Sequence, residues 1–169
     1  SASVVRRRIA RALLDHGGYA EQAVASASDV FRLPDTMDFE TAAGFPIVYG
    51  TSHIALWERA CLRPGETLVV HGAAGGVGLT AVEIGKAMGA TVIATAGSAE
   101  KLEVAASRGA DHLINYKSED IRTRVKELTG GQGVQLILDF VGASYAAENL
   151  MALAYRGALI GIGLMGGIM

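Results

Sequence analysis

The sequence of 169 residues has a single cysteine, no long apolar run and a small net charge. Cys61 is the only cysteine, so no disulfide can form within the chain, and we expect a reducing compartment, the cytoplasm. No apolar run is long enough to cross a bilayer, so we expect no membrane partner. The formal net charge of −2 gives no general reason to expect nucleic acid as a partner.

Glycine and hydrophobic residues, by contrast, are plentiful. The 22 glycines are many for this length and are expected of an α/β fold, in which tight turns join strands to helices. Hydrophobic residues make up 50% of the chain, which is enough for a sizeable core. The length fits one compact domain.

Residues 1–11 contain four arginines and no acidic residue. Three interpretations of this basic segment stay open. It is the remnant of an organelle-targeting segment, an arm that contacts nucleic acid, or a solvated strand or helix at the edge of a missing domain.

The next part of the chain mixes turns and helices. A turn is predicted at residues 17–18, followed by a short alternating strand over 19–24. Asp38 is a plausible N-cap for a helix that ends before Pro46. A second helix is predicted over about 48–60.

The most informative segment is a glycine-rich turn between a strand pattern over 67–71 and a helical pattern. Its spacing is Gly72-x-x-Gly75-x-x-Gly78, with Gly76 beside it. The glycines let the backbone turn sharply and approach a pyrophosphate, whose charge is stabilised at the positive N-terminus of the helix. Glycine turns also close ordinary strand–helix units, but the strand before and the helix after this one favour dinucleotide binding.

Strands and helices alternate from residue 67 onward. Strands are predicted over 67–71, 91–95, 112–115, 136–140 and 158–162. Helices are predicted over about 76–88, 99–108, 118–129 and 144–154. Continuous apolar strands separated by amphipathic helices predict an α/β fold with a doubly wound parallel sheet, the Rossmann type.

A ligand of such a sheet binds outside the carboxyl ends of its strands. The turns after the five predicted strands therefore supply the candidate site residues, which are Gly72 to Gly78, Gly97 and Ser98, Tyr116, Val141 and Gly142, and Gly163.

The end of the second predicted strand indicates which dinucleotide binds. A site for NAD usually has Asp or Glu there, about twenty residues beyond the glycine turn. The sequence Ala96-Gly97-Ser98-Ala99 has no acid to repel a 2′-phosphate. Lys101 could pair with that phosphate and Tyr116 could donate a hydrogen bond to it, so NADPH is the favoured cofactor. The alternative for Lys101 is a solvated lysine on a helix, and the alternative for Tyr116 is a residue that packs at the edge. Glu100 lies in the first turn of a helix, where it is expected to stabilise the helix dipole.

Several motifs, in this order along the chain, resemble the zinc-independent quinone oxidoreductases of the medium-chain dehydrogenase/reductase superfamily. They are residues 44–53, 63–66, 71–78, 96–101, 109–111, 114–116, 136–139 and 163–167. The resemblance implies that residues 1–46 are the tail of a GroES-like β domain, which binds substrate, with a linker. Residues 47–169 would form the Rossmann-type domain, incomplete at its C-terminus, and its unpaired sheet edge would favour a homo-oligomer.

The resemblance also implies roles for single residues. Gly75, Gly76 and Val77 match the pyrophosphate turn of the family. Gly97, Lys101 and Tyr116 match positions that hold the 2′-phosphate, and the turn at Gly163 matches a segment that passes the nicotinamide. Thr51 matches a threonine beside the nicotinamide and the substrate, with a helix N-cap or a core hydroxyl as the alternative.

No metal is expected. The four histidines are scattered, and none pairs with Cys61 at a metal-ligand spacing. Packing or solvent exposure is the default interpretation for His16, His53, His71 and His112. Asp139 ends a strand, where it is expected to accept hydrogen bonds from backbone amides rather than act as an acid or base.

Two functions follow from these features. The first is an NADPH-dependent reductase of quinones or other α,β-unsaturated carbonyl compounds, in which the cofactor supplies the hydride. The second is a non-catalytic NADPH-binding or association module derived from such an enzyme, because most of the substrate domain of the family has no counterpart in this sequence.

Overall fold

The computed structural model describes residues 9–12 and 23–167, which belong to two compact units, Ser1–Ile47 and Val48–Met169. In the first unit, β1 (Ile9–Ala12) pairs antiparallel with β2 (Val30–Arg32), and a single 3₁₀ turn over Ala27–Asp29 precedes β2. The turn predicted at 17–18 and most of the strand predicted over 19–24 lie outside the described residues, and so do residues 1–8. That this unit is a remnant of a GroES-like domain stays a prediction.

Helix α1 (Phe39–His53) differs from the two helices predicted here. Asp38 is its N-cap, because Asp38 Oδ1 accepts the Thr41 N–H at 2.6 Å, and this bond lowers the pKa of the carboxyl. The expected break at Pro46 is wrong, since Pro46 lies inside α1. Pro46 has no N–H to donate to the Ala42 carbonyl oxygen and its ring crowds that carbonyl, but the turns before and after it are helical. A π-helix over Ile54–Arg59 follows α1.

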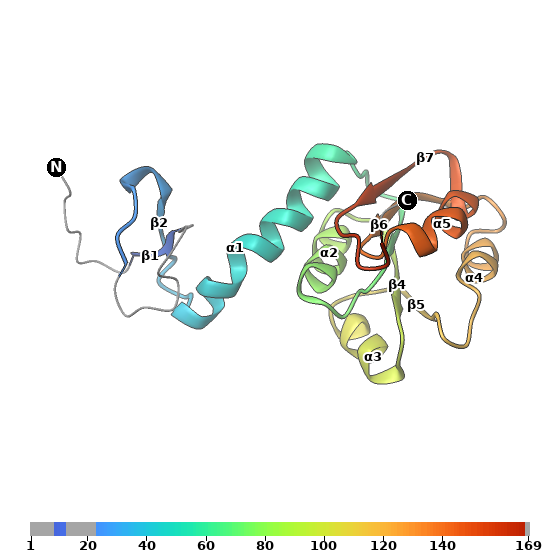
Figure 1. The fold of residues 1–169 in the computed structure, drawn as a ribbon, viewed down its shortest axis with the longest axis horizontal. Helices are drawn as coiled ribbons and strands as arrows, with labels where there is room; N and C mark the ends of the chain where they lie inside the picture. Colours follow the sequence, from blue (N-terminus) through green and yellow to red (C-terminus); the bar gives the residue numbers. More distant parts are fainter. Residues whose placement is uncertain (1–8, 13–22, 168–169) are drawn as a thin grey trace. The chain divides into compact units, whose positions relative to one another are not determined.

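The second unit is built on a five-stranded sheet in the order β5-β4-β3-β6-β7, and every neighbouring pair is parallel (Figure 1). Its strands are β3 (Thr67–Val70), β4 (Thr91–Ala96), β5 (His112–Asn115), β6 (Val134–Asp139) and β7 (Leu153–Gly161). Its helices after β3 are α2 (Gly76–Ala87), α3 (Ala99–Ser107), α4 (Ile121–Leu128) and α5 (Ala146–Ala152). A 3₁₀ turn, η3 (Ala143–Tyr145), precedes α5.

Side chains alternate across this sheet and fill a separate core on each face. Leu68 and Val70 of β3 pack with residues of α2 and α3 on one face. Val69, between them in sequence, packs on the other face with Ile121 and Val125 of α4. Because successive strand residues point to opposite faces, this division shows helices on both faces of the sheet. The predicted doubly wound α/β sheet is confirmed.

The chain order reverses direction at the centre of the sheet. From β3 the chain moves to β4 and then β5 on one side, whereas β6 and β7 lie on the other side of β3. The carboxyl ends of β3 and β6 therefore flank the point at which ligands bind in folds of this type.

Two predicted element bounds shift for identifiable reasons. Helix α4 begins at Ile121 rather than 118, because Asp120 Oδ1 accepts the Thr123 N–H at 2.7 Å and caps the helix. Strand β7 begins at Leu153 rather than 158, because Leu153 already pairs with Val134 before an irregularity in the register.

No helix in the described part of the chain is both long and apolar enough to cross a membrane.

Candidate functional site

The glycine turn after β3 places backbone atoms where a side chain would not fit. Gly72 has a φ of +56°, which favours glycine. A Cβ on Gly78 would clash with the Gly72 carbonyl oxygen and lie 2.9 Å from the Ala73 Cα. Gly75 is the N-cap of α2, so the turn leads directly into the helix. The third glycine therefore allows the first turn of α2 to pack against the glycine turn.

The N-terminus of α2 offers hydrogen-bond donors to a ligand. The first N–H groups of any α-helix have no acceptor within the helix, and the helix dipole makes this end positive. In α2 these groups belong to Gly76, Val77 and Gly78. Gly75 and Gly76 are exposed, so an anion can approach. The predicted residues Gly75, Gly76 and Val77 thus lie together at a helix N-terminus of the kind that binds anions, and their role in holding a pyrophosphate stays a prediction.

The C-terminal part of α1 packs on this same helix end. The Ser52 hydroxyl donates to the Val77 carbonyl oxygen at 2.8 Å, and it lies 2.8 Å from the Thr80 hydroxyl. A Cβ on Gly76 would lie 3.1 Å from the Val48 Cγ1, so these two helices are in close contact. Thr51 is half-buried beside Ser52 and lies inside α1, which excludes the helix N-cap as its role. Its predicted place beside the nicotinamide stays a prediction.

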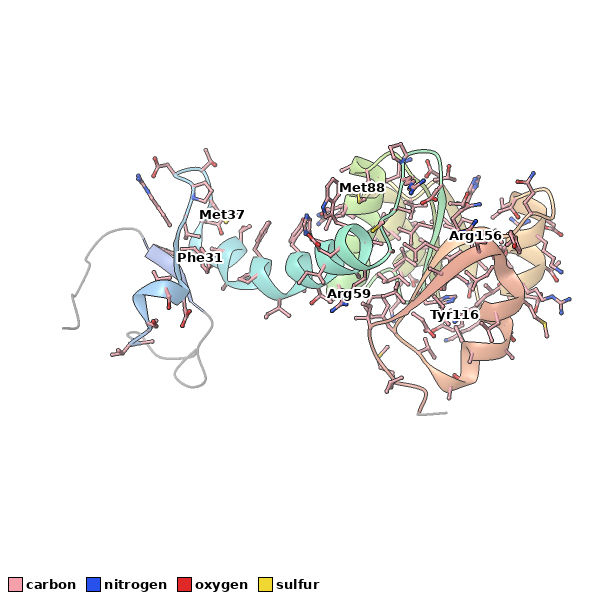
Figure 2. The ribbon with its side chains drawn as sticks, turned by 90° about the horizontal axis from the view of Figure 1, so that it is seen from above. Phe31, Met37, Arg59, Met88, Tyr116 and Arg156 are labelled. Carbon is pink, nitrogen blue, oxygen red and sulfur yellow. The ribbon has the colours of Figure 1, made fainter. Side chains whose placement is uncertain are left out.

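At the end of β4, Tyr116 lies beside Gly97, and both are residues predicted for the 2′-phosphate. A Cβ on Gly97 would lie 2.6 Å from the Tyr116 hydroxyl oxygen and 2.8 Å from the Tyr116 Cζ. A side chain at position 97 would therefore displace the Tyr116 ring from this strand end; Tyr116, 41% exposed, is labelled in Figure 2. Ser98 is the N-cap of α3, and its hydroxyl accepts the Lys101 N–H at 3.5 Å. The side chain of Lys101 is exposed.

The loop after β6 and the segment after β7 are tied together at the opposite half of the sheet edge. The Gly166 N–H donates to the Val141 carbonyl oxygen at 2.6 Å, and the Ala143 N–H donates to the Gly167 carbonyl oxygen at 3.3 Å. Gly142 has a φ of +87°, and a Cβ on it would lie 2.9 Å from the Gly167 oxygen. The two segments that contain the predicted residues Gly142 and Gly163 are therefore held side by side.

Asp139, the last residue of β6, holds the loop that follows this strand. Its carboxylate is buried and accepts hydrogen bonds from the N–H groups of Val141 at 2.7 Å and Gly142 at 3.2 Å. The prediction that Asp139 accepts hydrogen bonds from backbone amides is confirmed. Asn149 Nδ2 also donates to Asp139 Oδ2, at 3.1 Å.

Asn149 connects this carboxylate to His71, a buried histidine for which the sequence favours no role beyond packing or exposure. Asn149 Oδ1 lies 2.7 Å from His71 Nε2, and His71 Nδ1 lies 3.0 Å from the Thr95 hydroxyl. Because the amide nitrogen of Asn149 donates to Asp139, its oxygen is the acceptor, so His71 carries its proton on Nε2. The Thr95 hydroxyl then donates to Nδ1. Burial lowers the pKa of His71, which keeps the ring neutral.

Sequence patterns do not reveal this network, because its members come from different strands and a helix. Thr95, Asn149 and Tyr145 show no spacing relation to His71 in the sequence, and only the fold brings them together. The ring of Tyr145 contacts the His71 ring edge-on at 5.2 Å and lies 6.2 Å from the ring of Tyr116. Burial raises the pKa of the Tyr145 phenol.

The remaining histidines have the placements expected of packing or exposed residues. His53 is exposed and stacks on Trp57 with the ring centroids 6.2 Å apart, and His112 is half-buried. His16 lies outside the described residues. Across residues 9–12 and 23–167, no group of three or more His, Cys, Asp or Glu side chains is placed to hold a metal ion.

Comparison with known proteins relates this site to a family. The model of the family "zinc-binding dehydrogenase" matches residues 76–168. Quinone oxidoreductase-like protein 2 of Bos taurus is 37% identical over 151 residues, which cover 89% of this chain and 43% of that protein. Quinone oxidoreductase of Homo sapiens is 35% identical over 152 residues, which cover 90% of this chain and 46% of that protein.

A solved structure shows the same fold. The crystal structure of Escherichia coli quinone oxidoreductase complexed with NADPH matches with a TM-score of 0.80 and 37% sequence identity. The match covers 85% of this chain and 44% of that one. The chain therefore spans less than half the length of these relatives.

Proposed function

The chain belongs to the zinc-binding dehydrogenase family, and from this premise we propose that it is an NADPH-dependent oxidoreductase that transfers a hydride to a quinone or another α,β-unsaturated carbonyl compound. The observation that carries the proposal concerns the end of β4. Gly97 lets Tyr116 lie over this strand end, and no acidic residue follows the strand that would repel a 2′-phosphate. Within residues 9–12 and 23–167, no group of His, Cys, Asp or Glu side chains is placed to hold the zinc of the family name, so we assign no role to zinc in this proposal.

The residues present fit the pyrophosphate of the cofactor. The first turn of α2 supplies N–H groups and a positive dipole end, and the contact of Gly78 with Gly72 leaves no room for side chains between them. We assign the pyrophosphate to Gly75, Gly76 and Val77.

The residues at the ends of β4 and β5 fit the 2′-phosphate. We assign it to Gly97, Ser98, Lys101 and Tyr116. The Lys101 ammonium supplies charge and the Tyr116 hydroxyl supplies a donor. An Asp or Glu at the end of β4 would favour the unphosphorylated cofactor, and this chain has none there.

The nicotinamide side of the site is formed by Thr51, Gly142 and Gly163 in this proposal. When bound, NADPH supplies a hydride. The residues of the chain hold the loops at this edge of the sheet, and a hydroxyl such as that of Thr51, or water, would deliver a proton to the reduced substrate. Since a quinone or enone needs no strong base, the scarcity of ionisable side chains among these residues agrees with the reaction.

The alternative function is an NADPH-binding or association module without catalysis. This function needs only the cofactor site assigned above, at the glycine turn and at the ends of β4 and β5. Both functions predict cofactor binding, and only the first predicts turnover.

Titration of the purified chain with NADPH and with NADH, followed by cofactor fluorescence, tests the proposal. We expect NADPH to bind at least about tenfold more tightly, since charge-assisted hydrogen bonds to the 2′-phosphate form only with NADPH. Replacing Lys101 by methionine is expected to remove most of this preference. Equal affinity for both cofactors, or no binding, would contradict the NADPH assignment. Oxidation of NADPH with a small quinone then separates the enzyme from the binding module.

We further propose that the chain forms a homo-oligomer through β7. In the described sheet β7 pairs only with β6, so its second edge offers unpaired backbone groups to another copy. Sedimentation velocity is expected to show association that increases with protein concentration. A monomer over the whole concentration range would rule out this contact.

The single, exposed Cys61 supports a reducing compartment such as the cytoplasm as the location.

A further inference from the structure

We propose that Lys117 is a second cation of the 2′-phosphate site and contributes to the preference for NADPH over NADH. This inference rests on the proposed function and adds a specificity residue that the glycine and strand motifs do not indicate. Lys117 follows β5, whereas Lys101 belongs to the first turn of α3, so the two lysines approach the end of β4 from different elements.

The side chain of Lys117 lies over the same glycine as Tyr116. A Cβ on Gly97 would lie 3.2 Å from the Lys117 Cε, beside the 2.6 Å approach of the Tyr116 hydroxyl oxygen. The Lys117 ammonium is one bond beyond that Cε. Because Gly97 has no side chain, the Tyr116 phenol and the end of the Lys117 side chain come together beside it, and this is the combination of donors that a phosphate group requires.

Hydrogen bonds hold the backbone around Lys117, so the base of its side chain stays beside the end of β4. Asn115 Oδ1 accepts the Lys117 N–H at 3.1 Å, and the Asn115 carbonyl oxygen accepts the Ser118 N–H at 3.0 Å. The Tyr116 N–H donates to the Ala96 carbonyl oxygen at 3.3 Å, which continues the pairing of β5 with β4. The turn after β5 is thus held against the end of β4.

The acidic residue nearest in sequence, Glu119, does not pair with Lys117, so the Lys117 ammonium is available to a phosphate. Glu119, two residues away, is already engaged, because its Oε1 accepts the Asn115 N–H at 2.8 Å and its Oε2 lies 2.9 Å from Arg124 Nε. Within the described residues, Lys101 and Lys117 have no ion pair, in contrast to Lys86, which pairs with Asp111 at 2.7 Å. Two unpaired lysines match the charge of a phosphate monoester, which is about −1.5 to −2 at neutral pH.

The test compares four single variants, Lys101→Met and three further ones, with the wild-type chain by titration with NADPH and NADH at low and high salt. Lys117→Met is expected to weaken NADPH binding about five- to tenfold at low salt and to leave NADH binding unchanged, because only NADPH carries the phosphate. Lys117→Arg is expected to keep most of the affinity. Lys126→Met removes the same charge from an exposed position in α4 and is expected to change neither affinity.

The outcomes separate this inference from the proposed function. If wild type prefers NADPH and Lys101→Met loses the preference but Lys117→Met keeps it, Lys117 has no such role and the proposed function stands. Equal loss of NADPH and NADH affinity in Lys117→Met would show a structural effect and would also overturn the inference. If the wild-type chain binds neither cofactor, the proposed function itself fails.

Discussion

Replacing Gly78 by alanine is expected to abolish NADPH binding and to lower the free energy of unfolding by about 1–3 kcal/mol. The added Cβ would clash with the Gly72 carbonyl oxygen and lie 2.9 Å from the Ala73 Cα. Both are backbone atoms of the turn, so relief requires the turn to move away from α2. That movement would displace the N–H groups assigned to the pyrophosphate.

The sign of the change in the free energy of unfolding of Gly78→Ala shows whether the close packing of Gly78 or its helix propensity dominates. Gly78 lies in α2, where propensity alone would make alanine stabilising by about 1 kcal/mol. Gly44→Ala in α1 is the matched control, because a Cβ there meets nothing within 4 Å. We expect Gly44→Ala to raise the free energy of unfolding and to leave the affinity for NADPH unchanged. Urea unfolding and cofactor titration measure both quantities, and a stabilised Gly78→Ala that still binds NADPH would refute the packing argument.

Replacing Asp139 by alanine is expected to lower the free energy of unfolding by about 3–5 kcal/mol. The variant would leave the N–H groups of Val141 and Gly142 and the Asn149 amide without their common acceptor. Asn149 would then also be free to turn away from His71. We expect faster hydrogen exchange at Val141 and Gly142, together with weaker cofactor binding, because these residues border the site.

Asp120→Ala is the control for this change. Asp120 also accepts a backbone N–H, that of Thr123, but it is an exposed helix cap. Removing it is expected to cost much less than removing the buried carboxylate and to leave cofactor binding unchanged. Equal losses of stability in the two variants would mean that the buried network adds nothing beyond a single cap.

The same network gives the stability of the protein a pH dependence. Burial lowers the pKa of His71 below its usual 6.5, so below that pH the unfolded chain binds more protons than the folded one. The free energy of unfolding therefore falls as the pH falls from about 6.5, by at most about 2 kcal/mol at pH 5. His71→Gln lacks this titration, and we expect its stability to change less over this range. Identical slopes for the two proteins would contradict a neutral, buried His71.

Much of the fold could be predicted because it depends on local patterns. Strands β3 and β5 agree with their predicted ranges to within one residue, since short apolar runs bounded by turns leave few alternatives. Asp139 as an acceptor for backbone amides follows from its position at the end of an apolar run. The prediction that a helix ends before Pro46 is wrong. Proline interrupts the backbone hydrogen bonds of a helix at one position, and the turns before and after Pro46 are helical.

The sequence by itself determined the glycine turn, the alternation of strands and helices, and the absence of an acid after β4, because each is written in consecutive residues. Only the tertiary structure decided which distant side chains meet. Neither the contact of Tyr116 and Lys117 with Gly97 nor the path from Thr95 through His71 and Asn149 to Asp139 has a spacing signature. These contacts arise because parallel pairing aligns the carboxyl ends of strands that are remote in the chain.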